Sequence, residues 1–252
     1  MISRAGTSSI RSIAPCSSRS APRRSDDVAV AVPITMIEAG LLLQHARWTL
    51  SAVAFKTRFS HLPFTDYHFE TASYSYVERT SIADTSTIGL ELTGHADLFG
   101  PLKLDVLATL QDPRYRNFCY SELIGGAPVL RDATDNQLIR VPRLSLRATP
   151  SLTFFDGRLR LDTELVYSSV RFADSANSQR LPPYSLINMD VNAKLTPRLT
   201  LALHATNLTN ALGLTEGNPR AGSFDAGGSA PAFFMARPEF GRAVRATVTF
   251  AS

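Results

Sequence analysis

The sequence lacks a long apolar run. None of its 252 residues belongs to a stretch of about 18 consecutive apolar side chains, which excludes a transmembrane helix. It also has little cysteine: Cys16 and Cys119 lie far apart and form no C-x-x-C motif, so we expect no disulfide framework. The five histidines show no metal-ligand spacing, and we therefore expect no metal site and no cofactor.

The net charge of the chain is small. The chain has 26 Lys and Arg against 22 Asp and Glu, and no basic stripe with stacking aromatics appears in its folded part, so a nucleic-acid partner is not expected. The start of the chain is rich in Ser and Arg and shows no apolar core of a secretory signal. We expect residues 1–36 to be a disordered or artefactual leader, followed by one folded segment, residues 37–252.

Two-residue alternation of apolar and polar side chains is the strongest pattern present. In residues 241–250, Val244, Ala246, Val248 and Phe250 alternate with Ala243, Arg245, Thr247 and Thr249. The same period recurs in residues 37–45, 47–59, 86–98, 102–110, 139–150, 158–168, 186–195 and 198–207. These patterns predict about nine strands of about 9–13 residues, closer to the 9–11 of a tilted membrane-crossing strand than to the 5–6 of a globular one.

The predicted connections alternate in length along the chain. Short ones fall near Ala46, at Phe99–Gly100, in residues 151–157 and at Thr196–Pro197, and long ones span residues 60–85, 112–138, 170–183 and 208–240. Outer-membrane barrels have short periplasmic turns and long extracellular loops. The sequence thus predicts an all-β fold, an antiparallel transmembrane β-barrel segment whose last strand ends at the periplasm.

Five short motifs lie in order on this ladder of strands: HLPFTDYHF (61–69), GLELTG (89–94), NLTN (207–210), GLTEGNPR (213–220) and ARPEFGR (236–242). Together they resemble the carboxy-terminal barrel of TonB-dependent outer-membrane receptors, over roughly residues 37–250. The residues that carry this family pattern are Asn207, Leu208, Asn210, Gly217, Asn218, Pro219, Arg237, Pro238, Gly241 and the near-terminal aromatic Phe250.

The resemblance implies a barrel of twenty-two strands that surrounds an amino-terminal plug and takes up a scarce ligand with energy from the TonB complex. The ligand class it implies is an iron chelate, cobalamin or a carbohydrate. This chain shows no plug domain, no TonB-contacting segment and no signal peptide, and about 22 strands of roughly 10 residues would consume nearly all of it. We therefore expect a partial barrel in the outer membrane. Its partners are membrane lipid, the missing plug and strands, and TonB for a full-length receptor only.

Ligand contacts are expected on the long loops, because functional residues concentrate on loops held by a rigid scaffold. Arginine and tyrosine suit anionic or sugar-like ligands. The candidates are Tyr115, Arg116, Tyr120, Arg171, Arg180, Glu216, Asn218 and Arg220. Asp162 and Glu164 lie about 7 Å apart on one strand face, but the polar lining of a barrel explains them, and we predict no enzyme activity.

Two alternatives remain open from the sequence. One is a small outer-membrane barrel that acts as a passive pore or adhesin, and the other is a soluble periplasmic β-domain. The short and long connections disfavour the soluble domain. The order of the motifs around Asn207, Gly217 and Arg237 disfavours the small barrel.

Overall fold

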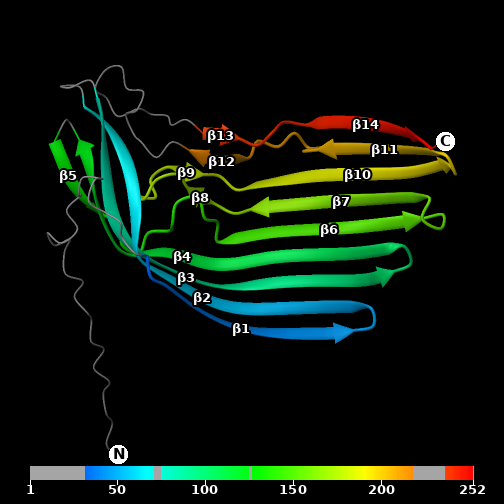
Figure 1. The fold of residues 1–252 in the computed structure, drawn as a ribbon, viewed down its shortest axis with the longest axis horizontal. Helices are drawn as coiled ribbons and strands as arrows, with labels where there is room; N and C mark the ends of the chain where they lie inside the picture. Colours follow the sequence, from blue (N-terminus) through cyan, green and yellow to red (C-terminus); the bar gives the residue numbers. More distant parts are fainter. Residues whose placement is uncertain (1–31, 71–74, 125–126, 218–235, 252) are drawn as a thin grey trace, which may run out of the picture.

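The computed structural model describes residues 32–70, 75–124, 127–217 and 236–251, which form strands and loops. No helix in this part of the chain is long and apolar enough to cross a membrane. The main sheet follows an antiparallel path of nine strands, each paired with its neighbours along that path (Figure 1). They are β1 (Ile34–His45), β2 (Trp48–Glu70), β3 (Ser75–Phe99), β4 (Leu102–Ile124), β6 (Leu144–Phe154), β7 (Leu159–Ser168), β10 (Tyr184–Thr196), β11 (Leu199–Thr206) and β14 (Ala243–Phe250).

Each of the nine predicted strands is present. β1 begins at Ile34 rather than at residue 37, and β6 begins at Leu144 rather than at residue 139. Arg140, before β6, has a φ of 63° and donates its amide to Phe172 O at 2.8 Å. That left-handed backbone and loop contact end the sheet pairing there, although the side chains continue to alternate.

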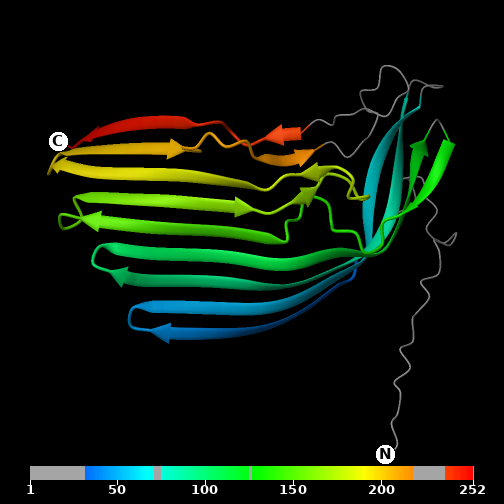
Figure 2. The ribbon, with the colours of Figure 1, turned by 180° about the vertical axis from the view of Figure 1, so that it is seen from behind.

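The first two predicted long loops are wrong in part, because both contain paired strand. β2 and β3 continue to Glu70 and Ser75 beyond a bulge between Phe59 and Leu62. β4 likewise continues to Ile124 and pairs with β5 (Ala127–Asp132). Pairing satisfies backbone groups that a loop would leave to water. Figures 1 and 2 show these extensions projecting beyond the shorter strands.

Among the described residues, the last two long connections contain small ladders. β8 (Arg171–Phe172) pairs with β9 (Arg180–Leu181), and β12 (Leu214–Gly217) pairs with β13 (Ala236–Pro238). The short turns lie at the opposite end of the sheet, where the chain also ends (Figure 1). The turn predicted over residues 151–157 is shorter than expected, since β6 runs to Phe154 and the reversal uses positive φ at Phe155, Asp156 and Gly157.

The strand register gathers the predicted apolar sets on one face of the sheet, here called the apolar face. One cross-strand row contains Val248, Leu201, Ala193, Leu159 and Phe154. A row nearer the loops contains Ala39, Ala54, Leu90, Leu110 and Leu144. From the short turns up to that second row, the described strands place no Asp, Glu, Lys or Arg on this face. Such a band is what a hydrocarbon environment requires.

Exposed aromatic side chains border this band at the short-turn end. Phe99 is 69% exposed and Phe250 is 70% exposed. Trp48 stacks on His45 with ring centroids 5.7 Å apart, and Phe154 lies 6.4 Å from Phe155. Aromatic girdles of this kind mark the edge of the apolar band in membrane barrels.

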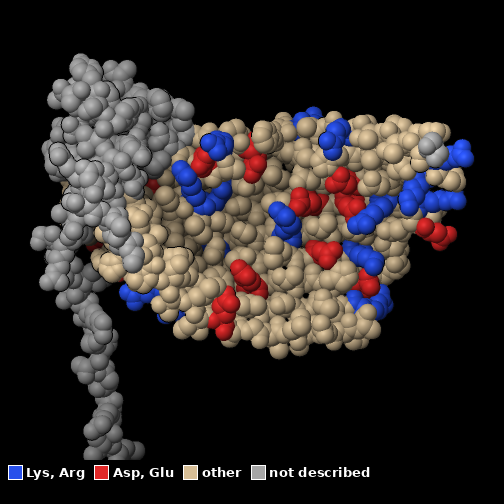
Figure 3. Space-filling view, viewed as in Figure 1, with Lys and Arg blue, Asp and Glu red and all other residues tan. Residues whose placement is uncertain are grey.

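The opposite face of the sheet, here called the charged face, carries the polar members of each alternation. Acidic and basic side chains lie interspersed on the face seen in Figure 3. A single cross-strand row contains Arg245, His204, Asp190, Asp162, Ser151, Lys103 and Asp97. The two faces therefore face different environments, as they do in a barrel wall.

The small hydrophobic core lies at the loop end, where β3 and β4 extend beyond the apolar band. Ala83, Tyr115, Phe118 and Ala133 are buried there, with Phe64, Tyr120 and Leu138 packed against them. Next to this core, Cys119 is disulfide-bonded, which the expectation of no disulfide framework did not foresee. The only other cysteine, Cys16, lies outside the described residues.

Candidate functional site

The segments at the end opposite the short turns contact one another and form one surface, here called the loop platform: residues 111–124, 127–143, 169–183, 207–217 and 236–240. The Tyr115 hydroxyl lies 3.3 Å from Ser175 Oγ, and Asn136 Nδ2 donates to Ser175 O at 2.8 Å. These contacts join the segment after β4 to the segment between β8 and β9. Burial raises the pKa of Tyr115, which stands beyond the apolar band.

A pair of amide side chains makes a second junction. Asn177 Oδ1 accepts the amide of Gln137 at 2.8 Å, and Asn177 Nδ2 donates to Gln137 O at 2.9 Å. The Gln137 side chain in turn donates to Val141 O at 2.7 Å. Asn177 has a φ of 59°, a conformation that asparagine tolerates better than most residues. The Asn177 side chain thus bonds both the amide and the carbonyl of Gln137, and this joins the two loops.

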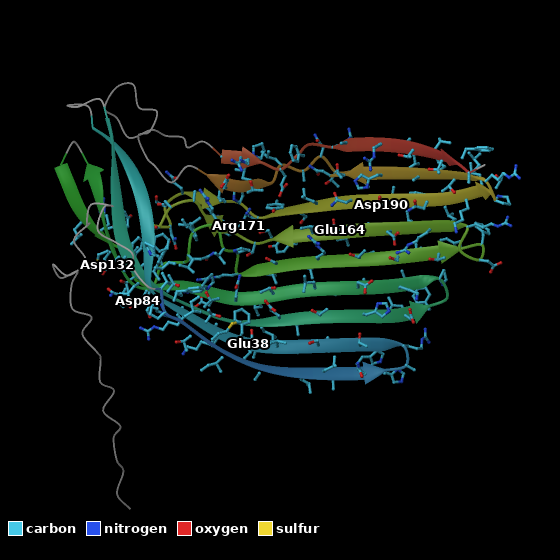
Figure 4. All side chains as sticks on the ribbon, viewed as in Figure 1. Glu38, Asp84, Asp132, Glu164, Arg171 and Asp190 are labelled. Atoms are coloured by element: carbon cyan, nitrogen blue, oxygen red, sulfur yellow. The ribbon has the colours of Figure 1, made fainter. Side chains whose placement is uncertain are left out.

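Arg171 links three segments from a buried position. Its residue is 5% exposed, and its guanidinium donates to Leu214 O at 2.6 Å and to Thr215 O at 3.1 Å. The same group lies 5.0 Å from the centre of the Tyr184 ring. Figure 4 shows Arg171 among the loop segments, away from Glu164 and Asp190 on the sheet. The Tyr184 hydroxyl donates to Glu239 Oε1 at 3.2 Å.

The motif NLTN connects the end of β11 to the start of β14. Asn207 is 2% exposed with a φ of 47°. Its side chain accepts the Ala211 amide at 2.8 Å and donates to Ala211 O at 2.9 Å and to Phe240 O at 3.0 Å. Asn210 Oδ1 accepts the Arg242 amide at 3.0 Å. These two motif asparagines therefore shape the backbone at this junction.

The predicted ligand residues divide into buried supports and exposed groups. Tyr115 and Arg171 are buried in the loop platform, so their described contacts are internal. Arg116 and Arg180 are exposed, and Arg116 Nη1 lies 2.7 Å from Asp135 Oδ1. Tyr120 is half-buried with its ring stacked 5.5 Å from Phe118.

Glu216 is half-buried between two arginines. Its carboxylate lies 3.0 Å from Arg140 Nη1 and 2.8 Å from Arg237 Nη1. Arg140 was missed as a partner of Glu216, because the apolar pattern in residues 139–150 predicted that Arg140 belonged to a strand. Asn218, Pro219 and Arg220 lie outside the described residues.

On the charged face, the two carboxylates of β7 have polar partners. Asp162 accepts from Ser151 Oγ at 2.6 Å and lies 2.7 Å from Arg160 Nε. Glu164 lies 3.1 Å from Arg147 Nε and accepts from Asn188 Nδ2 at 2.7 Å. Figure 4 shows Glu164 and Asp190 on neighbouring strands of this face. These contacts explain Asp162 and Glu164 as structural residues of the barrel wall.

Histidine and aspartate form two pairs on the same face. His204 Nδ1 lies 2.6 Å from Asp190 Oδ1, and His95 Nδ1 lies 2.7 Å from Asp105 Oδ1. Within the part of the chain that the structure describes, no group of three or more His, Cys, Asp or Glu side chains could hold a metal ion. These pairs are cross-strand contacts of the sheet.

The family comparison identifies this architecture. Residues 35–208 match the family model described as TonB dependent receptor-like, beta-barrel. The chain belongs to the TonB-dependent receptor β-barrel family. This match covers the first eight of the nine main strands, and members of the family are receptors and transporters, not enzymes.

Solved TonB-dependent receptors share the fold. The ferric yersiniabactin uptake receptor FyuA from Yersinia pestis is 15% identical with a TM-score of 0.64, over 86% of this chain and 29% of that one. The siderophore receptor PiuA from Acinetobacter baumannii is 16% identical with a TM-score of 0.63, over 86% and 28%. The copper transporter OprC is 16% identical with a TM-score of 0.62, over 86% and 32%. No curated protein sequence matches the chain.

The chain therefore spans less than a third of the length of these three receptors. Within a TonB-dependent receptor barrel, the apolar face is the lipid-facing side of the wall and the charged face is its inner side. The resemblance that the sequence motifs indicated is confirmed, as is the all-β antiparallel barrel segment.

Proposed function

We propose that this chain forms a wall segment of an outer-membrane TonB-dependent receptor that takes up a scarce ligand at its loop platform. The observation that carries the proposal is the pairing of an uncharged apolar band with cross-linked loops at one end only. A passive pore needs the band but not the loop contacts made by Arg171 and Asn177. A receptor needs both, because its loops must hold ligand-contacting side chains in place.

The two edges of the sheet indicate how the receptor is completed. Among the described strands, β1 pairs only with β2, and β14 pairs only with β11. Both edge strands run toward the short-turn end, because β1 leads into the first short turn and β14 ends beside the last one (Figure 1). An antiparallel closure between them needs an odd number of further strands. We propose that a longer receptor supplies these strands together with a plug and its TonB contact.

Ligand recognition is assigned to polar residues of the loop platform. We place the exposed Arg116 and Arg180 and the half-buried Glu216 among them, with Tyr120 as an aromatic contact and with Asn218 and Arg220 as candidates outside the described residues. Tyr115 and Arg171 act from beneath by holding the loops. The ligand class is an iron chelate, cobalamin or a carbohydrate. The ferric yersiniabactin receptor and the siderophore receptor that share the fold favour the iron chelate.

Calorimetric titration of the full chain in detergent with ferric yersiniabactin, cyanocobalamin and maltohexaose tests this assignment. We expect saturable binding of the iron chelate that weakens about tenfold in an Arg116→Ala, Arg180→Ala double variant. Lys194→Gln, which removes a cation near a short turn, is the matched control and should bind as the parent does. Equal binding by parent and double variant contradicts the assigned residues, and saturable binding of cyanocobalamin or maltohexaose in place of the iron chelate contradicts the preference for the iron chelate.

A further inference from the structure

Four basic side chains stand where the apolar face meets the loop end, and together they are called the basic rim. They are Lys56, Arg58, Arg114 and Arg143. Lys56 is exposed, and the side chains of Arg58 and Arg143 are 57% and 49% exposed. The charged face does not account for a cationic cluster on the lipid-facing side of the wall, and the loop contacts account only for Arg114, which donates to Asp135 O at 2.6 Å. The cluster therefore needs a separate explanation.

The strand register shows that these cations border the uncharged band directly. Ile88 pairs with Lys56 on one side and with Asp112 on the other. One step toward the loops, Ser86 pairs with Arg58 on one side and with Arg114 on the other. Side chains two residues apart on a strand share a face. The rows through Ile88 and Ser86 are therefore the next two rows on the apolar face after the row through Leu90.

The carboxylates within the rim do not neutralise it. Asp112 Oδ1 lies 2.8 Å from Arg114 Nε and 3.4 Å from Arg143 Nη2, so one carboxylate is shared by two arginines. Asp84 Oδ2 lies 3.8 Å from Arg58 Nη2. Four cations face two carboxylates among the described residues of this border. The rim therefore attracts anions.

A shallow hollow joins the cations to the apolar surface beneath them. It has a volume of about 530 Å³, and Arg114 and Arg143 line it together with Ile88, Leu90 and Leu110. Ile88 is 56% exposed and Leu110 is 58% exposed. A neighbouring hollow of about 400 Å³ shares Arg143 and adds Leu144, Tyr167 and Val170. Both volumes fall in the range of small-molecule sites, about 300–1,000 Å³.

We propose that the basic rim is a binding site for a phosphorylated lipid of the loop-side leaflet. Arg114 and Arg143 bind the phosphate of the headgroup, and its acyl chains lie on Ile88, Leu90 and Leu110. Arginine forms forked hydrogen bonds to phosphate, and basic clusters at the membrane border attract anionic headgroups. A water-soluble anion would match the cations but would leave the apolar half of the hollow without a partner.

This inference rests on the proposed placement of the chain in the outer membrane. It is tested by native mass spectrometry of the full chain in neutral micelles that contain lipid A, a diphosphorylated glycolipid. Phosphatidylcholine serves as the lipid without net charge, and inorganic phosphate serves as the headgroup chemistry without acyl chains. We expect bound lipid A, little phosphatidylcholine, and no inorganic phosphate at the same concentration.

Three variants make the test specific. An Arg114→Gln, Arg143→Gln double variant should lose about tenfold or more in lipid A affinity. Each basic side chain near a membrane surface contributes several-fold to the affinity for anionic lipid, and this variant removes two. Asp112→Asn removes the shared carboxylate and should strengthen binding several-fold. Arg245→Gln makes the same change of charge on the opposite face and should change binding less than about twofold.

The outcomes separate this inference from the proposed function. Lipid A bound equally by parent and double variant, no gain in Asp112→Asn, or phosphate bound as tightly as lipid A would each overturn the lipid site. If the double variant does not fold, the lipid A affinity of Asp112→Asn still tests the lipid site. A parent chain that stays folded and monomeric in plain buffer and does not bind micelles would instead overturn the outer-membrane placement.

Discussion

Asp162 on β7 stands directly across from Asp190 on β10, and each carboxylate has partners of its own. Arg160 and Ser151 hold Asp162, while His204 holds Asp190. Like charges directly opposite each other on a sheet are destabilising. The partners therefore let two acidic residues occupy adjacent positions on the inner side of the wall.

Arg160→Gln should destabilise the sheet by about 0.5–1 kcal/mol, because Asp162 would keep only Ser151 among these partners while still facing Asp190. The effect should shrink in high salt, which screens exposed charges. Urea unfolding in lipid vesicles, followed by the fluorescence of Trp48, the only tryptophan of the chain, measures it. Lys194→Gln is the control on the same face. Equal loss in both variants would show that the Asp162–Asp190 contact has no special cost.

Gly89 packs its backbone against the ring of Phe55. A Cβ at this position would lie 2.5 Å from Phe55 Cζ and 2.8 Å from the carbonyl oxygen of Leu110. Gly89→Ala should therefore cost about 1–3 kcal/mol, the usual cost of overpacking. Gly40→Ala is the matched control, since its nearest contact would be Val53 Cγ2 at 3.4 Å. The same unfolding assay should separate the two, and equal stability would contradict the packing at Gly89.

Asn207 should be the most sensitive residue of the NLTN motif. Asn207→Ala removes bonds to Ala211 and Phe240 in a buried site, and we expect it to cost about 2–4 kcal/mol. Asn210→Ala removes one described side-chain bond, to the Arg242 amide, and should cost less. Proteolysis near β14 provides a second measurement, because the junction to this edge strand would open. A cost for Asn207→Ala no larger than that for Asn210→Ala would refute this role.

Alkaline pH should loosen the loop platform through Tyr115. The folded pKa of this hydroxyl lies above its usual value of about 10 because burial disfavours the charged form. The corresponding stability is therefore complete below about pH 10 and is lost as the pH rises through the folded pKa. Protease sensitivity of the loops against pH should show this loss in the parent and a weaker loss in Tyr115→Phe. Tyr167→Phe, on the apolar face, should behave as the parent does.

Sequence periodicity predicted the sheet well because every apolar set had to reach the same face. A shift of one residue in any strand would have placed Leu161 or Leu201 among the charges, so the pattern also specified the register. The extensions of β2, β3 and β4 were missed because the alternation of apolar and polar residues weakens there. Backbone pairing alone continues the strands there.

The site was predicted less well than the fold. The arginines and tyrosines predicted in the loops remain ligand candidates, and their burial could not be inferred from composition. Tyr115 and Arg171 lie inside the loop platform because contacts over long sequence separations enclose them, such as that of Tyr115 with Ser175. The basic rim was missed for a related reason. Its members come from β2, β4 and the segment before β6, and only the register brings them together.

The central claim is that one face of this sheet meets lipid and the other meets water. Single spin labels placed in turn at Leu161, Asp162, Thr163 and Glu164 of β7, in the full chain in lipid vesicles, test it most directly. The account predicts that collisions with oxygen dominate at Leu161 and Thr163 and that collisions with a water-soluble nickel chelate dominate at Asp162 and Glu164. Equal access of both reagents at all four positions would contradict it.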